Sequence, residues 1–164
     1  MFREMRRKNQ LLSLEDTIAV LERGTNGILA VSGDDDYPYA VPLSYIYTND
    51  KIYFHCAKTG HKLDGIKKNA KVSFCVVDQD QNVPEKYTTY FRSAIAFGQA
   101  KILEDPAEIR TAITAIAEKY SPDYKEGIPA EINSSMTSLC IVEITIDHLT
   151  GKEAIELVRA RNNQ

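Results

Sequence analysis

The segment from Tyr37 to Tyr47 constrains the fold most, because large and small residues alternate along it with a period of two. Successive side chains of a β-strand point to opposite faces, so the pattern predicts a strand with one large-residue face. Pro38 and Pro42 fall on the face of mostly small residues. Since proline cannot donate to a hydrogen-bond ladder, we expect a free or irregular strand edge near Pro42.

Five more segments have strand-like patterns, at residues 26–33, 51–56, 71–77, 88–103 and 139–147. Helices are predicted in the N-terminal segment 1–24, at 61–69, at 106–120 and at about 152–159, whereas 78–86 and 121–137 have the composition of loops. Six strands with helices set apart from them favour an antiparallel barrel with peripheral helices, in the α+β class. We expect a single domain over residues 1–164.

Composition excludes several classes of protein. Of the 164 residues, 43% are hydrophobic and 26% charged, which is typical of a globular domain, and the net charge of −3 argues against nucleic-acid binding. No apolar run is long enough to span a membrane, and the N-terminal arginines lead into polar Asn9 and Gln10 instead of a signal sequence. We therefore expect a cytoplasmic protein, in which Cys56, Cys75 and Cys140 are buried free thiols.

The sequence lacks the common catalytic fingerprints. It contains no glycine-rich dinucleotide or nucleotide phosphate loop, no nucleophile elbow and no paired-histidine zinc motif. His55 and Cys56 are adjacent on a predicted strand, so their side chains point to opposite faces and cannot together chelate a metal. We expect no metal site.

One short segment could bind a phosphate. Gly60 allows close approach of a ligand to the backbone, and the predicted helix that follows offers unpaired N–H groups at its start. Lys62, and to a lesser degree His61, add positive charge. The alternative is an ordinary surface helix whose first-turn charges are solvated, and the spacing alone does not separate the two.

Taken together, several segments resemble the pyridoxamine-phosphate-oxidase-like flavoproteins, and within them most closely the nitroimidazole-resistance branch. The resemblance covers almost the whole chain and rests on the order and spacing of these segments. They are Pro38–Tyr45, Lys51–Ala57, Gly60–Asp64, Tyr90–Ala100 and Leu149–Glu153.

This resemblance implies a split barrel that forms a homodimer with FMN, or alternatively FAD, at the subunit interface. By this resemblance, the isoalloxazine ring is lined by Val41, Pro42, Leu43 and Ser44, and His55 and Cys56 lie beside the flavin on the next strand. The phosphate is contacted by Gly60, His61 and Lys62, and the flavin is touched from the long strand by Ser93.

The chain departs from the family's vitamin B6 oxidases at two points. His61 stands where those oxidases have an arginine, and the C-terminus lacks their arginine-rich motif, so pyridoxamine phosphate is not the expected substrate. The first hypothesis is a flavin-dependent reductase that passes electrons from NAD(P)H to a small acceptor such as a nitroaromatic, with His55 as the candidate catalytic residue. The second is a flavin- or haem-binding protein without catalysis, in which His148 is an axial ligand.

Overall fold

The computed structural model describes residues 1–163. Its strands are β1 (Gly27–Ser32), β2 (Pro38–Leu43), β3 (Ile46–Thr48), β4 (Lys51–Ala57), β5 (Lys71–Val83), β6 (Thr88–Ile102) and β7 (Leu139–Glu153). Its α-helices are α1 (Leu14–Arg23), α2 (His61–Lys68), α3 (Pro106–Tyr120), α4 (Ile128–Ser135) and α5 (Ile155–Asn162). Short 3₁₀ segments lie at Lys8–Gln10, Asp34–Asp36, Pro84–Lys86 and Pro122–Gly127.

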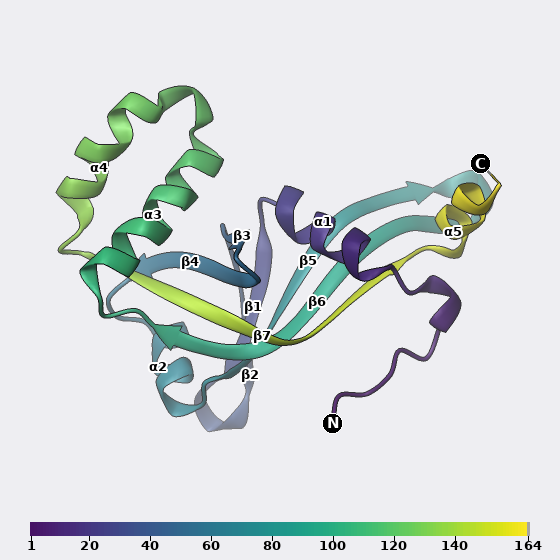
Figure 1. Cartoon of the computed structure of the whole chain (residues 1–164). Coiled ribbons are helices and arrows are strands. Elements are labelled where there is room, and N and C mark those ends of the chain that lie inside the picture. Colours follow the sequence, from purple (N-terminus) through teal and green to yellow (C-terminus); the bar gives the residue numbers. More distant parts are fainter. Residues whose placement is uncertain (164) are drawn as a thin grey trace.

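The strands form one antiparallel sheet in the order β2-β1-β5-β6-β7-β4-β3, with the helices around it (Figure 1). The α+β class with an antiparallel sheet is therefore confirmed. The two outermost strands of this order, β2 and β3, are joined by only two residues, Ser44 and Tyr45. Because so short a connection must bring both edges of the sheet together, the sheet curls into a barrel.

The alternating segment that predicted one strand forms two, so the sheet has seven strands and not six. The break falls at Tyr45, whose side chain is completely buried and whose hydroxyl donates to the carbonyl of Leu21. The Tyr45 N–H donates to the hydroxyl of Tyr120, 2.9 Å away, instead of to a neighbouring strand. Contacts of one buried tyrosine with two helices thus override the local strand pattern.

Three other sequence predictions need correction. The predicted loop at 78–86 is mostly strand, because β6 supplies partners for β5 as far as Val83. The predicted loop at 121–137 contains α4, whose Ile128 and Ile132 are buried one helical turn apart. The C-terminal helix is Ile155–Asn162 and not 152–159, because β7 continues to Glu153 in register with β6.

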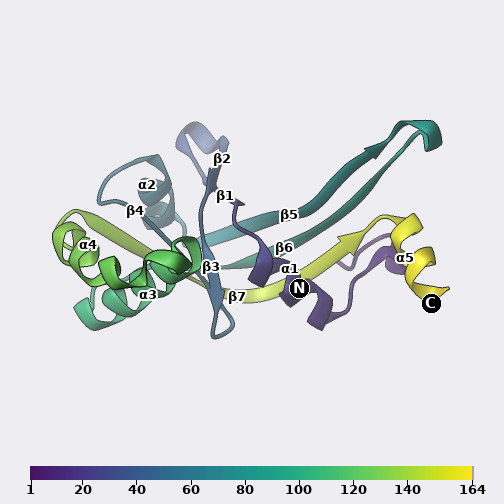
Figure 2. The same cartoon turned by 90° about the horizontal axis from the view of Figure 1, so that it is seen from above.

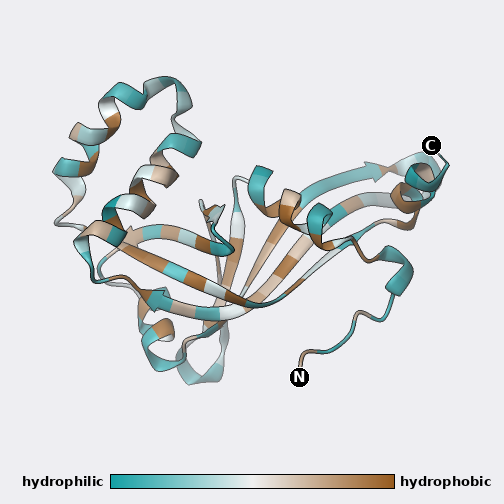
Figure 3. Cartoon of the chain, viewed as in Figure 1, coloured by the Kyte–Doolittle hydropathy of each residue, from teal (hydrophilic) through white to brown (hydrophobic). Residues whose placement is uncertain are grey.

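Two hydrophobic cores hold the molecule together. The first fills the barrel, where Val20 and Leu21 of α1 meet the inner side chains of the strands, among them Phe54 and Phe74. The second lies outside the barrel, between the α3–α4 hairpin and the outer face of β7, around Ile141. Figure 3 shows the corresponding hydrophobic bands along the strands and the more hydrophilic outer turns of the helices.

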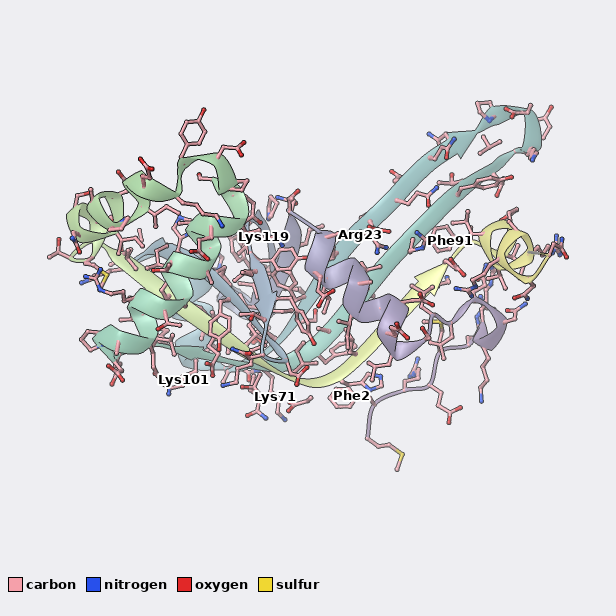
Figure 4. The ribbon with its side chains drawn as sticks, turned by 45° about the horizontal axis from the view of Figure 1, so that its top comes forward. Phe2, Arg23, Lys71, Phe91, Lys101 and Lys119 are labelled. Carbon is pink, nitrogen blue, oxygen red and sulfur yellow. The ribbon has the colours of Figure 1, made fainter. Side chains whose placement is uncertain are left out.

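The far halves of β5 and β6 project from the barrel as a hairpin arm (Figure 2). A register shift between Val77 and Gln79 marks its base at Asp78. Arg23 of α1, which lies beside this arm in Figure 4, donates twice to the Asp78 carboxylate, at 2.5 and 2.7 Å. Arg92 on β6 bridges Asp78 to the buried carboxylate of Glu153, so charged groups fix the arm to α1 and β7.

Among residues 1–163, no helix combines the length and the hydropathy that a membrane crossing requires.

Candidate functional site

The start of α2 leaves backbone donors open to a ligand. The N–H groups of Leu63 and Asp64 donate to the carbonyl of Gly60, and within the described chain those of His61 and Lys62 have no such acceptor. Gly60 has a φ of 139°, a conformation that favours glycine, and a Cβ placed on it would meet nothing within 4 Å. Open space thus adjoins the positive end of a helix dipole, which suits an anion.

His61 links this helix start to the edge of the sheet. Its imidazole stacks on Tyr39 of β2, with ring centroids 4.1 Å apart and planes 29° from parallel. Its Nε2 is buried without a hydrogen-bond partner in residues 1–163, and the nearest carboxylate, that of Asp34, is 3.7 Å away. Buried polar atoms without a hydrogen-bond partner are uncommon in folded proteins, so this atom marks His61 as unusual.

Lys62 supplies the positive charge at the same place. Its ammonium group forms no ion pair with any residue that the structure describes. Lys68, at the opposite end of α2, lies 3.8 Å from Asp36. The predicted trio of Gly60, His61 and Lys62 is therefore brought together around an open helix start, with the lysine available to an anion.

The strand segment predicted to contact the ring of a ligand lies beside this helix start. β2 pairs only with β1, which confirms the free edge expected near Pro42. Val41 and Leu43 pack on the barrel core, while Pro42 and Ser44 are exposed on the outside. Val41 and Leu43 can therefore contact a ligand through the backbone alone, and Pro42 and Ser44 also through their side chains.

A partly exposed row of residues crosses the outer face of the sheet from Pro42. Ile28, Cys75 and Ile95 follow in direct register on β1, β5 and β6. Ser93 lies on the same face, two residues before Ile95. Three inter-strand spacings of about 4.8 Å place β6 roughly 14 Å from β2, so one chain does not bring Ser93 beside Pro42.

His55 and Cys56 point to opposite sides of β4, as predicted. Cys56 packs on the barrel core directly opposite Cys140 of β7, and burial is the main cause that raises its pKa to about 11. His55 is exposed and lines a separate pocket under α3 and α4. The structure thus separates the side chain of His55 from the start of α2, and leaves Cys56 mainly its backbone for a ligand there.

All three cysteines are free thiols, but only Cys140 is buried; Cys56 and Cys75 are partly exposed. No cluster of three or more histidine, cysteine, aspartate or glutamate side chains with metal-binding geometry occurs in residues 1–163. His148, the candidate haem ligand, is stacked on Phe2 with ring centroids 4.7 Å apart and planes 4° from parallel. Sequence reasoning missed the part played by Tyr39, whose only signal was its place on the large-residue face of the alternating segment.

Comparisons with solved structures give the fold. A candidate 5-nitroimidazole antibiotic resistance protein from Bacteroides thetaiotaomicron matches with a TM-score of 0.71 and 18% identity, over 93% of this chain and 96% of that one. An FAD-binding protein from Mesorhizobium loti matches with a TM-score of 0.67 and 24% identity, over 88% and 97%. An FAD- and haem-binding protein from Mycobacterium smegmatis matches with a TM-score of 0.73 and 18% identity, over 90% and 74%.

A search of curated proteins gives no match. A sequence model described as pyridoxamine 5'-phosphate oxidase matches residues 13–153, which span both the start of α2 and the edge strand β2. The split barrel of the structural neighbours and this long match agree, and the chain belongs to the pyridoxamine 5'-phosphate oxidase family.

Proposed function

We propose that the chain binds FMN and is a flavin-dependent oxidoreductase that uses NAD(P)H to reduce a small acceptor such as a nitroaromatic. The observation that carries the proposal is the open start of α2, where Lys62, two unpaired N–H groups and the unpartnered Nε2 of His61 adjoin the free edge of β2. The family and the flavin-binding relatives support the choice of ligand.

In this proposal the phosphate lies at Gly60, His61 and Lys62, and the isoalloxazine ring lies along residues 41–44. The six residues from Tyr39 to Ser44 are separated by five steps of about 3.4 Å and so span about 17 Å, which suits an elongated mononucleotide. Bound FMN would supply the two-electron redox chemistry, while the protein orients it and excludes competing reactions. FAD, the longer flavin, is the alternative ligand for this site, and one structural relative is described as FAD-binding.

His55 is proposed as the proton donor or ligand contact for the acceptor. Its imidazole forms no hydrogen bond or ion pair with a described residue, so both ring nitrogens are available. The imidazolium form of a histidine can donate a proton, and the neutral form can accept one. Replacing His55 with Gln should lower the rate of acceptor reduction without loss of bound FMN.

A homodimer with the flavin at its interface completes the proposal. The outer face of the sheet exposes large apolar side chains, with Ile28 and Ile95 each 39% and Val77 55% accessible. Such a contiguous patch is typical of an interaction surface. Since Ser93 is far from Pro42 within one chain, a flavin that touches both would take Ser93 from the second subunit.

The visible spectrum of the purified protein tests the ligand, and anaerobic addition of NADPH tests the reaction. A two-banded flavin spectrum that bleaches with NADPH and recovers when a nitroaromatic is added is the expected result. A flavin spectrum that NADPH leaves unchanged would contradict the proposed electron donor. A Soret band without flavin would instead favour the haem-binding alternative, with His148 as the first ligand to replace.

A further inference from the structure

A second pocket lies under the α3–α4 hairpin, on the other side of β4 from the barrel core. In Figure 1 this hairpin rises from the end of the sheet at which β4 meets β7. The pocket has a volume of about 450 Å³, within the range of small-molecule sites. His55 contributes to it from β4, and the remaining walls come from α3, α4, the turn between them and the first residue of β7.

The inner wall of this pocket is apolar and fixed. Ile113 of α3 and Ile128 and Ile132 of α4 line it, and all three are buried members of the second hydrophobic core. Since these side chains pack on both the pocket and the core, the wall is held in place without a ligand. A flat or compact apolar ring is the kind of group that such a wall accommodates.

Two polar side chains at the pocket have no partner of their own. Neither the imidazole of His55 nor the carboxylate of Glu131 is hydrogen-bonded or ion-paired to any residue in 1–163. The bonds that Glu131 does accept, from Ser134 and Ser135, go to its backbone carbonyl. An acceptor and a titratable ring are therefore both available to a bound molecule.

The segment that closes the pocket has a net negative charge. Residues 121–135, which close it, carry the carboxylates Asp123, Glu126 and Glu131 against the single ammonium of Lys125. The described residues that line it include no lysine or arginine. A pocket with apolar walls and carboxylates at its border is expected to bind a cation more strongly than an anion of the same shape.

We propose that this pocket binds a small organic cation, formed by one apolar ring and a protonated amine. The ammonium group binds the Glu131 carboxylate, the ring packs on Ile113, Ile128 and Ile132, and His55 hydrogen-bonds at the ring's edge. This goes beyond the proposed flavin function, because the pocket is separate from the start of α2 and binding there needs no flavin. His55, which is also the proposed contact of the acceptor, is the one residue that the two proposals share.

The test uses three probes of one shape and different charge: benzylamine, benzyl alcohol and benzoate. Each is titrated into the purified protein while the imidazole signals of its three histidines are followed by NMR, with His55→Gln to assign the signal of His55. The shift of the His55 signal gives the affinity of each probe. Benzylamine should bind at least about tenfold more tightly than benzyl alcohol, because one charge-assisted contact is worth about tenfold in affinity, and benzoate should bind most weakly. His148, outside the pocket, should show no change.

Three variants separate a built site from a general surface charge. Glu131→Gln should bring benzylamine to the affinity of benzyl alcohol, and Ala117→Leu, which fills the pocket, should abolish binding of both. Glu126→Gln changes the same charge outside the lining and should leave the preference within about twofold of wild type. Equal affinity for the three probes, or equal loss in Glu126→Gln and Glu131→Gln, would overturn the proposal; it would leave the flavin proposal untouched, because none of these variants alters the start of α2.

Discussion

The imidazole of His61 stacks on the ring of Tyr39 at a centroid distance of 4.1 Å, which joins the first residue of α2 to the edge strand β2. The stack places the proposed phosphate-binding residues beside the strand proposed to contact the flavin ring. It is also consistent with a histidine at the position where the resemblance to the vitamin B6 oxidases implies an arginine. In the proposed site His61 is a fixed aromatic contact, and Lys62 carries the charge.

The position of α2 depends on a glycine packed against β1. A Cβ on Gly65 would lie 2.7 Å from the carbonyl oxygen of Ser32 and 2.8 Å from a methyl group of Val31. Gly65→Ala should therefore push α2 away from the sheet. We expect a net loss of about 1–2 kcal/mol in the free energy of unfolding, because overpacking outweighs the better helix propensity of alanine.

Urea denaturation of Gly65→Ala measures this loss, with Gly127→Ala as the control. A Cβ on Gly127 would contact nothing within 4 Å, so that substitution should change the free energy of unfolding by no more than about 0.5 kcal/mol. Equal stability of the two variants would show that α2 is not held by this close contact.

The hairpin arm should give the protein a defined acid sensitivity. Hydrogen bonds from Arg23 lower the pKa of Asp78 below its ordinary value of 3.8. A carboxylate whose pKa is depressed in the folded state contributes stability above its unfolded pKa and loses it as the pH falls through the folded pKa. Asp78→Asn should thus destabilise the protein at pH 6, and the difference from wild type should shrink by pH 3.

Urea midpoints at the two pH values test this prediction. Asp123→Asn, on an exposed turn and without an ion pair to any described residue, removes the same charge as a control. A difference between wild type and Asp78→Asn that is the same at pH 6 and pH 3 would exclude the ion pair as its source.

Local sequence patterns correctly predicted those elements that are specified by residues within the element itself or next to it. The helix Pro106–Tyr120 is found with its predicted bounds because its N-cap, Asp105, accepts from the N–H of Ala107, and its apolar stripe repeats at helical spacing. The start of α2 was predicted for the same reason, from Gly60 and the charged residues after it. Each signal lies within a few residues of the feature that it specifies.

Tertiary contacts determined what the sequence could not show. The break at Tyr45 depends on Tyr120, 75 residues later, and the strand after Asp78 depends on pairing with β6. The helix α4 is stabilised by burial of Ile128 and Ile132 against a core that no local pattern reveals. The position of His55 in a pocket under this helix could not be predicted while residues 121–137 were assigned to a loop.

The thiol of Cys56 should be alkylated slowly in the folded protein. Burial, followed by the neighbouring Cys140, raises its pKa to about 11, so the thiolate fraction at pH 8 is about 100-fold lower than for a thiol of ordinary pKa 9.0. A more basic thiolate is also a stronger nucleophile, which offsets about tenfold of this loss in reaction rate. We expect Cys56 in the folded protein to be alkylated by iodoacetamide about tenfold more slowly than in urea.

Peptide mass spectrometry over a time course gives this rate for each cysteine separately. Cys56 modified equally fast in the folded and unfolded protein would show that its thiol is not buried as the structure describes.

The most direct test of the central claim is titration of FMN and riboflavin into flavin-free protein, followed by flavin fluorescence. Wild type should bind one FMN per chain, and Lys62→Ala should weaken FMN binding by about 10- to 100-fold, the worth of a hydrogen bond to a charged group. Riboflavin, which lacks the phosphate, should bind both proteins equally, and Lys67→Ala at the other end of α2 should resemble wild type. Failure of wild type to bind FMN, or equal FMN affinity in Lys62→Ala and Lys67→Ala, would contradict the proposal that the start of α2 holds the flavin phosphate.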